Sequence, residues 1–303
     1  MVVMKIAVTG ANSSVGLNLL QHVIADDELD VIAAVRSERA AATLPVASRV
    51  EASIISYHDV TELAEAIAGV SCVVHLAGIL IEGKGSTYAH SNIASTEAVV
   101  KAAQIAEAKH LVLISVVGAS LDTSNAYFRS KALAEQFVEE SGISATIIRT
   151  PILLGPDTAG AHALVAAAAQ GRAKLLGGGR YFMRPLDVDD LSLAILKSCK
   201  CQANGVAVHE LVGPDSILYR DLVSRVARML GREITIGTIP IWSAKFLAAI
   251  TSRLQRGGIS PTVIDVITMN EVVHHNADAA IGITLTPLDK TLEKVMSTKK
   301  NTI

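Results

Sequence analysis

Three side chains in the middle of the chain have the types and spacing needed for acid–base chemistry: Ser115, Tyr127 and Lys131. Tyr127 and Lys131 are four residues apart in a helical stretch, NAYFRSKALAEQFVEES, so both are expected on one helix face. An ammonium group one turn from a phenol is expected to lower the phenol pKa. Such a tyrosine could exchange a proton with a substrate oxygen while hydride moves to or from a nicotinamide, and Ser115 could hydrogen-bond the same oxygen. The alternative is an incidental pair on a surface helix.

A glycine-containing turn near the start of the chain could hold the nicotinamide cofactor. The sequence KIAVTGANSSVG, residues 5–16, predicts a strand at Ile6–Thr9, a turn, and a helix at Val15–Ile24. This pattern is typical of dinucleotide-binding folds, although Ser13 replaces the usual middle glycine, and an ordinary strand–helix turn is the alternative. The helix start would direct free N–H groups at a pyrophosphate. The predicted contacts are Gly10, Asn12, Ser13, Ser14, Val15 and Gly16.

The elements around these residues alternate between strand and helix. Predicted strands follow at Val31–Val35, Val50–Ile55, Cys72–Leu76, Leu111–Ser115 and Ala145–Arg149, with helices at Thr61–Ala68, Ala89–Glu107 and Tyr127–Ser141. Continuous apolar strands suit a parallel sheet that is covered on both faces. The pattern predicts an α/β protein with a Rossmann-type doubly wound sheet, whose ligand crevice lies at the carboxyl ends of the strands.

The residue after the second predicted strand bears on the choice of cofactor. An acidic residue there binds the ribose 2′-hydroxyl of NAD, but the chain has Arg36, and a guanidinium suits a 2′-phosphate. We therefore predict NADP, with NAD possible if Arg36 is only a solvated loop charge. Two further strand ends are candidate contacts because they lie on the crevice side: Asp59 with Val60, and Leu76, Ala77 and Gly78.

Composition narrows the classes of partner. The 303 residues carry a net charge of −2, 50% are hydrophobic and 3% are aromatic, which argues against nucleic acid or anionic lipid as the main partner. Three cysteines give no disulfide framework and suggest a reducing compartment. The N-terminal residues show no signal-peptide pattern, and no apolar run is long enough to span a membrane. We expect a cytoplasmic protein.

The chain length favours a large domain with a smaller second part. We predict a dinucleotide-binding domain over residues 1–150, completed by about 186–213 with a late strand at Val206–Val212. Residues 151–185 and 214–303 would form a mainly helical substrate lobe. Asp187, Asp189 and Asp190 are expected to cap the helix at Leu191–Cys199, so no metal is assigned.

The helix expected at Trp242–Leu254 has two interpretations. Its apolar residues, together with Lys245, Arg253 and Arg256, could form a surface for a membrane or a partner. The favoured expectation is a helix of the lobe with its apolar residues facing inward, because the basic residues are few.

Taken together, the motifs resemble those of the short-chain dehydrogenase/reductase superfamily, in its extended or atypical branch that includes the NAD-dependent epimerase/dehydratase family. The matching segments are TGANSSVG, HLAG at 75–78, Asn92, ISVVGA at 114–119, YFRSK at 127–131, RTPILLGP at 149–156 and RPLDVDD at 184–190. The resemblance implies that Ser115, Tyr127 and Lys131 are catalytic and that Lys131 also holds the nicotinamide ribose. It further implies cofactor contacts at Asn92, Pro151, Ile152 and Leu153, with Asp59 near the adenine.

Three functions are consistent with this resemblance. The first is an oxidoreductase that transfers hydride between NADP(H) and a carbonyl or alcohol of a small organic substrate. The second is a nucleotide-sugar epimerase or dehydratase with tightly bound NAD, although the link between Ser115 and Tyr127 is short for that group. The third is a non-catalytic NADP-binding subunit, resembling the accessory homologue in respiratory complex I. A homodimer through the helices at Ala89–Glu107 and 126–141 is also expected.

Overall fold

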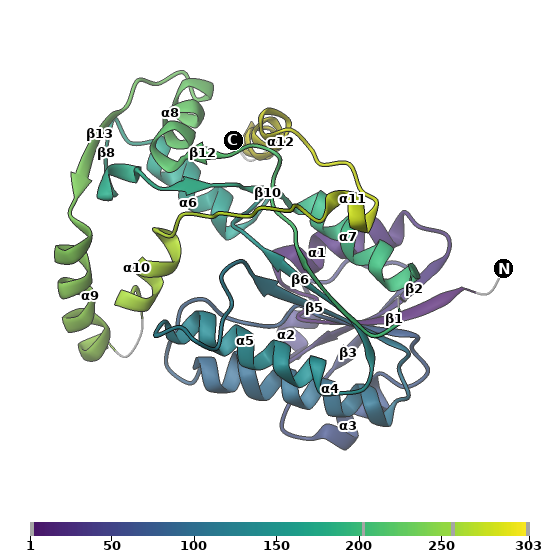
Figure 1. The fold of residues 1–303 in the computed structure, drawn as a ribbon. Coiled ribbons are helices and arrows are strands. Elements are labelled where there is room, and N and C mark those ends of the chain that lie inside the picture. Colours follow the sequence, from purple (N-terminus) through teal and green to yellow (C-terminus); the bar gives the residue numbers. More distant parts are fainter. Residues whose placement is uncertain (1–2, 202–203, 256–257, 301–303) are drawn as a thin grey trace.

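The computed structural model describes residues 3–201, 204–255 and 258–300, and its centre is a seven-stranded sheet (Figure 1). The strands are β1 (Met4–Thr9), β2 (Leu29–Val35), β3 (Val50–Ile54), β4 (Cys72–His75), β5 (His110–Val116), β6 (Ser144–Thr150) and β11 (Val206–Glu210). They lie in the order β3-β2-β1-β4-β5-β6-β11, and all neighbouring pairs are parallel. The order reverses between β1 and β4, as in a doubly wound Rossmann sheet. The predicted fold class and the late strand are therefore confirmed.

Helices cover both faces of this sheet because successive side chains of each strand point to opposite sides. Ile6 and Val8 join the core beneath α1 (Ser14–Ile24) and α7 (Val188–Cys201). Ala7 joins the core on the other face, which is covered by α3 (Val60–Ala66), α4 (Ser95–Ile105) and α5 (Ala126–Glu139) (Figure 1). A short α2 (Glu38–Ala41) follows β2.

The long helix expected at 89–107 is divided. A π-helical turn, η1 (Ala89–Ala94), precedes α4, and the hydroxyls of Ser95 and Thr96 bond to the carbonyls of Ser91 and Asn92, each at 2.7 Å. Wide turns of this kind often occur at functional sites. Here the turn contains Asn92, which is buried.

The smaller lobe has its own hydrophobic core. Its helices are α6 (Ala159–Ala168), α8 (Tyr219–Met229), α9 (Ile241–Gln255), α10 (Pro261–Ile267) and α12 (Leu288–Lys300). Short strands pair as β7 (Leu153–Leu154) with β10 (Leu186–Asp187), β9 (Phe182–Met183) with β12 (Ile217–Leu218), and β8 (Arg172–Leu176) with β13 (Thr235–Ile239); η2 (Gly177–Gly179) lies after β8. A smaller, mainly helical second part is thus confirmed, while the exact domain limits stay a prediction. Next to α11 (Asp278–Ile281), the Ala277 amide bonds to Glu210 of β11, so this segment lies against the main sheet.

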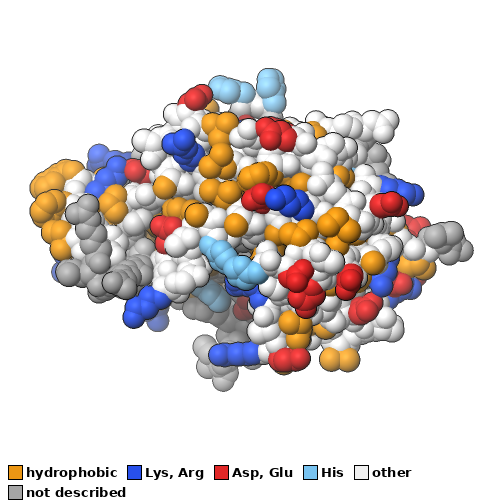
Figure 2. Space-filling model, turned by 90° about the horizontal axis from the view of Figure 1, so that it is seen from below, with side chains coloured by type: hydrophobic (Ala, Val, Ile, Leu, Met, Phe, Trp, Pro, Cys, Tyr) orange, Lys and Arg blue, Asp and Glu red, His pale blue; other side chains and the backbone are white. Residues whose placement is uncertain are grey.

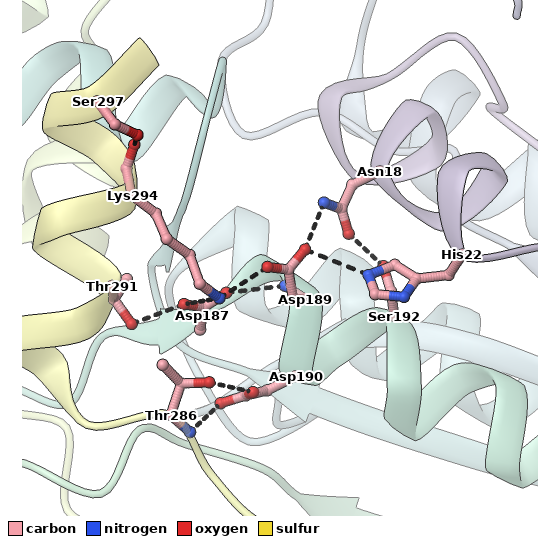
Figure 3. A network of polar contacts seen from close by, with 10 residues as sticks. All are labelled: Asn18, His22, Asp187, Asp189, Asp190, Ser192, Thr286, Thr291, Lys294 and Ser297. Carbon is pink, nitrogen blue, oxygen red and sulfur yellow. Dashed lines mark hydrogen bonds and ion pairs between the residues drawn. The ribbon is translucent and has the colours of Figure 1, made fainter. Parts of the chain in front are cut away.

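A polar network joins α12 to the start of α7 (Figure 3). Asp187 is fully buried, and its carboxylate accepts hydrogen bonds from Thr291 at 2.7 Å and Lys294 at 2.9 Å. Lys294 also bonds to Asp189 at 2.7 Å, and Asp189 accepts a bond from Asn18 of α1 at 2.8 Å. The network therefore holds the last helix of the lobe against the dinucleotide-binding domain.

The carboxylates at the start of α7 accept hydrogen bonds from nearby backbone and side-chain groups. Helix α7 starts at Val188, three residues earlier than expected, and the Asp189 amide donates to the Asp187 carboxylate at 2.9 Å. Asp190 accepts two bonds from Thr286, each at 2.7 Å. Within the described part of the chain, no group of three or more His, Cys, Asp or Glu residues is arranged to hold a metal ion.

The expectation that the apolar residues of α9 face inward is wrong. Trp242, Phe246 and Leu247 are 75%, 68% and 62% exposed, and Figure 2 shows hydrophobic side chains gathered at the left edge, where Figure 1 places α9. The helix packs mainly on α10 and buries a small residue, Ala248, so its large side chains point outward. Arg256 lies outside the described residues. None of the helices in the described ranges is long and apolar enough to cross a membrane.

Candidate active site

A cavity of about 460 Å³ opens at the carboxyl ends of the central strands, where the fold places a ligand. It is lined by the turn after β1 and by the segments that follow β2, β3 and β4, together with η1. The lining residues are Gly10, Asn12, Ser13, Val35, Arg36, Ile55, Ser56, Tyr57, His58, Leu76, Ala77, Gly78, Ile79, His90, Ser91 and Ser95.

The turn after β1 fits a dinucleotide pyrophosphate. Gly10 has φ +73°, and a Cβ atom there would lie 3.0 Å from the Ala77 amide nitrogen. A Cβ on Gly16 would lie 2.4 Å from the Ala11 carbonyl oxygen, so this turn closes only around glycine. Ser13 has an extended backbone and its hydroxyl accepts a hydrogen bond from the Gly16 amide at 3.0 Å. Ser13, which stands where the motif usually has its middle glycine, is therefore the N-cap of α1.

Positive charge and aromatic rings line the other end of the cavity. Arg36 is exposed there, and His58 stacks on His90 with ring centroids 4.9 Å apart. Among the described residues that line the cavity, none is acidic. Asp59 instead caps α3 by accepting hydrogen bonds from the amides of Thr61 and Glu62, each at 3.0 Å. A 2′-phosphate would therefore meet a cation and no carboxylate in this lining.

Ser115 and Lys131 lie together at the end of β5 beside this cavity, and Tyr127 lies one turn before Lys131 on α5; none of the three lines the cavity. Ser115 ends the buried part of β5, and its side chain is 4% exposed. Lys131 of α5 reaches back to the same strand and donates to the Ile114 carbonyl at 2.8 Å. Tyr127, one turn earlier, packs against Tyr88 with ring centroids 5.8 Å apart. The four-residue spacing puts Tyr127 and Lys131 on one face of α5, and Lys131 reaches the end of β5.

The electrostatics of the trio differ from the expectation. Burial raises the pKa of Tyr127, and the neighbouring Tyr88 adds to this shift. The predicted lowering of the Tyr127 pKa by Lys131 is wrong for the protein chain on its own, because burial disfavours the phenolate and the ammonium is directed at Ile114. Burial also lowers the pKa of Lys131 to about 8, although Glu135 one turn further along α5 opposes this shift. Tyr127 is therefore protonated at neutral pH.

Helix α5 is anchored from behind the site. Arg149 of β6 forms a bidentate ion pair with Glu135, with distances of 2.6 and 3.1 Å. Glu135 is buried, so this pair fixes the helix that carries Tyr127 and Lys131.

The Asn92 side chain holds the loop after β4. Its carbonyl oxygen accepts a hydrogen bond from the Ile79 amide at 2.7 Å, and its amide group donates to the Ile79 carbonyl at 3.1 Å.

The structure places some predicted cofactor contacts in the cavity lining and others outside it. Those in the lining are Gly10, Asn12, Ser13, Arg36, Leu76, Ala77 and Gly78; those outside it are Ser14, Val15, Gly16, Asp59, Val60, Asn92, Tyr127, Lys131, Pro151, Ile152 and Leu153. For every one of these residues, contact with the cofactor stays a prediction. Sequence reasoning did not select Tyr57, His58 and His90, although Tyr57 and His58 immediately precede the selected Asp59.

These features define a Rossmann-type α/β protein with a dinucleotide site. The family model described as NAD(P)H-binding matches residues 10–175, and the chain belongs to this family. The predicted NAD(P)-binding family and Rossmann-type fold are thus confirmed.

Similar proteins include a subunit of NADH dehydrogenase and an epimerase. The chain is 26% identical over 187 residues to the mitochondrial NADH dehydrogenase [ubiquinone] 1 alpha subcomplex subunit 9 of Arabidopsis thaliana; the match covers 60% of this chain and 46% of that protein, so it spans about half of the relative. Among solved structures, MoeE5 in complex with UDP-glucose and NAD has a TM-score of 0.76 at 17% identity, covering 98% and 99% of the two chains. UDP-glucuronic acid 4-epimerase from Bacillus cereus has a TM-score of 0.75 at 19% identity, covering 99% and 100%. At these identities the structures show a shared fold.

Proposed function

We propose that the protein is an NAD(P)-dependent oxidoreductase that reduces a carbonyl group of a small organic substrate, with NADPH as the hydride donor. The observation that carries this proposal is that the Lys131 ammonium bonds to the Ile114 carbonyl, next to Ser115 at the end of β5, with Tyr127 one turn earlier on the same helix and the cavity that begins at Gly10 alongside. The bound nicotinamide would supply the hydride. Cytoplasmic location and a homodimer remain predictions.

The roles of the three residues follow from their protonation states. Tyr127 keeps its proton because burial raises its pKa, so it is suited to give that proton to the oxygen of a carbonyl as hydride reaches the carbon. The buried Ser115 hydroxyl has no hydrogen-bond partner within the described chain and can donate to the same oxygen. Lys131 would hold the nicotinamide ribose and favour negative charge near the phenol once the cofactor is bound.

A first experiment separates an exchanging reductase from an epimerase. The purified protein is denatured, any released nucleotide is identified by mass, and the emptied protein is titrated with NADPH and NADH. A protein without nucleotide that binds NADPH more tightly supports the proposal and is then tested for NADPH oxidation with a panel of aldehydes and ketones. Stoichiometric NAD in the extract would instead favour the nucleotide-sugar epimerase or dehydratase alternative. The structure of MoeE5, which holds NAD and UDP-glucose, is an argument for that alternative.

Arg36 is expected to set the preference for NADPH. Arg36→Ala should weaken NADPH binding by roughly 10- to 100-fold, the value of a hydrogen-bonded ion pair with phosphate, and leave NADH binding nearly unchanged. Arg39→Ala is the matched control, because Arg39 is also exposed but lies outside the cavity lining. Calorimetric titration of both variants with both cofactors measures the effect. If Arg36→Ala weakened NADPH and NADH binding equally, Arg36 would not be a contact of the 2′-phosphate.

A second candidate function is that of a non-catalytic subunit that binds a partner protein. The outward apolar face of α9 favours it, and so does the similarity to a subunit of NADH dehydrogenase. Exposed patches of this kind mark interaction surfaces. In this function the protein would bind a dinucleotide without turnover on the carbonyl panel.

The α9 face gives this candidate a direct test. Replacing Trp242 and Phe246 by serine should abolish a partner complex seen by size-exclusion chromatography or pull-down from the native source, since aromatic anchors dominate interfaces. The free energy of unfolding should stay within about 0.5 kcal/mol, because both side chains are exposed. Exposed Leu121→Ser, on the loop before α5, is the control. A complex that survives the double substitution would place the partner on another surface.

A further inference from the structure

A row of polar side chains crosses the carboxyl ends of three adjacent strands. Thr9 of β1 is in register with His75 of β4, and His75 is in register with Leu113 of β5. Because residues two apart on a strand face the same side, Ser115 lies on the face of Leu113 and His75. Leu113 belongs to the core on the α3–α5 side of the sheet. The row therefore faces α5, the helix that carries Lys131.

Two atoms of this row need partners. The His75 side chain is 0% exposed, and its Nδ1 lies 2.6 Å from the Thr9 hydroxyl. His75 Nε2 and Ser115 Oγ are the two buried side-chain atoms without a hydrogen-bond partner within residues 3–201, 204–255 and 258–300. Buried polar groups are almost always paired, with protein or with ordered water.

The Thr9 hydroxyl determines which imidazole nitrogen carries the proton. A hydroxyl has one hydrogen and two lone pairs. The Thr9 hydroxyl donates its hydrogen to the Val74 carbonyl at 3.5 Å. A lone pair of the same hydroxyl then accepts the 2.6 Å hydrogen bond from His75 Nδ1–H. Nε2 is then a bare acceptor, and the imidazole is neutral because burial and the charge of Lys131 lower the His75 pKa to about 3.

Lys131 is the complementary donor. Its ammonium has three N–H groups, and within the described residues one of them bonds to Ile114. A Cβ atom on Gly78, three residues after His75, would lie 3.8 Å from the Lys131 ammonium nitrogen, so the ammonium lies between the ends of β4 and β5. The other titratable groups around this cluster are Glu135 and Tyr127 on α5, and Tyr57 on the side of Thr9.

We propose that His75 is a positioning residue for Lys131: its Nε2 accepts a hydrogen bond from an ordered water that the Lys131 ammonium and the Ser115 hydroxyl also contact. The water has three partners, within the usual number for a buried water. The arrangement keeps Lys131 charged and aimed at the nicotinamide ribose. The inference rests on the proposed function for its catalytic meaning, but the contacts themselves are testable without substrate.

The test uses two nuclear magnetic resonance measurements on the full chain. Long-range ¹H–¹⁵N spectra of the imidazoles should show His75 with Nδ1 protonated and Nε2 bare. The Lys131 Cε and Nζ resonances, assigned with Lys131→Arg, are then followed against pH. In His75→Phe, loss of the acceptor disfavours the ammonium, so the Lys131 midpoint should fall by about one pH unit, a tenfold change in its protonation equilibrium.

His110→Phe is the matched control. His110 is also 0% exposed and lies on β5, but its nitrogens bond to the hydroxyls of Ser144 and Thr146 at the opposite end of the strand. It should leave the Lys131 midpoint unchanged. The proposal is overturned if His75 carries its proton on Nε2, if His75→Phe leaves Lys131 unchanged, or if both variants shift Lys131 equally. The tautomer is measured on the native chain, so this result stands even if His75→Phe does not fold, and it does not depend on turnover.

Discussion

Tyr127→Phe is expected to abolish carbonyl reduction while leaving NADPH affinity nearly intact. The substitution removes the phenolic proton donor and keeps the ring that packs against Tyr88 and Phe128. General acid catalysis is worth about 10²- to 10⁴-fold, so kcat should fall by at least about 100-fold. NADPH oxidation measures the rate, and calorimetric titration measures cofactor binding.

Tyr181→Phe is the control for loss of a buried phenol. Tyr181 is 6% exposed and stacks on Tyr219 in the lobe, with ring centroids 5.5 Å apart. It should retain the wild-type rate to within about threefold, since a substitution away from reacting groups leaves transition-state contacts intact. If Tyr127→Phe turned over at the native rate, Tyr127 would not be the acid. If both variants lost activity together, the loss would reflect the packing of the chain rather than proton transfer.

Much of the fold could be predicted because local sequence patterns determine its strands, turns and helices. The apolar strands and the glycine turn predicted a doubly wound sheet, and the observed strand order confirms it. The four-residue spacing of Tyr127 and Lys131 indicated a shared helix face, and Lys131 does reach the end of β5. These features depend on backbone periodicity, which the sequence expresses directly.

Other features depend on contacts between distant segments and were not predictable. The pKa of Tyr127 is raised by burial and also by its neighbour Tyr88, which lies almost forty residues earlier in the sequence. The outward face of α9 follows from how the helix packs on α10, not from its own composition. In the sequence His75 is only the first residue of the HLAG segment, because its Nε2, which has no partner within the described residues, becomes evident only in the folded structure.

Gly16→Ala should have a large effect on both stability and dinucleotide binding. The added Cβ would lie 2.4 Å from the Ala11 carbonyl oxygen and 2.7 Å from its Cα. These are backbone atoms, so the clash is relieved only by moving the turn or α1. Overpacking of this kind costs about 1–3 kcal/mol in the free energy of unfolding, which urea denaturation measures. Ala11 adjoins Asn12 and Ser13, which line the cavity, so dinucleotide affinity should fall at least about tenfold.

The comparison with Gly171→Ala separates this clash from a general effect of replacing glycine. A Cβ on Gly171 meets no atom within 4 Å, and its backbone is not left-handed, so Gly171→Ala should unfold at or slightly above the native urea midpoint and bind NADPH normally. Binding to Gly16→Ala is titrated without denaturant, at a temperature where the urea curve shows it folded. A folded Gly16→Ala protein with native affinity would mean that the turn can move without losing its ligand, and the pyrophosphate would then have to lie elsewhere along the strand ends. A folded protein with weakened binding would tie the close approach of Gly16 and Ala11 to the cofactor, since the same methyl group at Gly171 has no such effect.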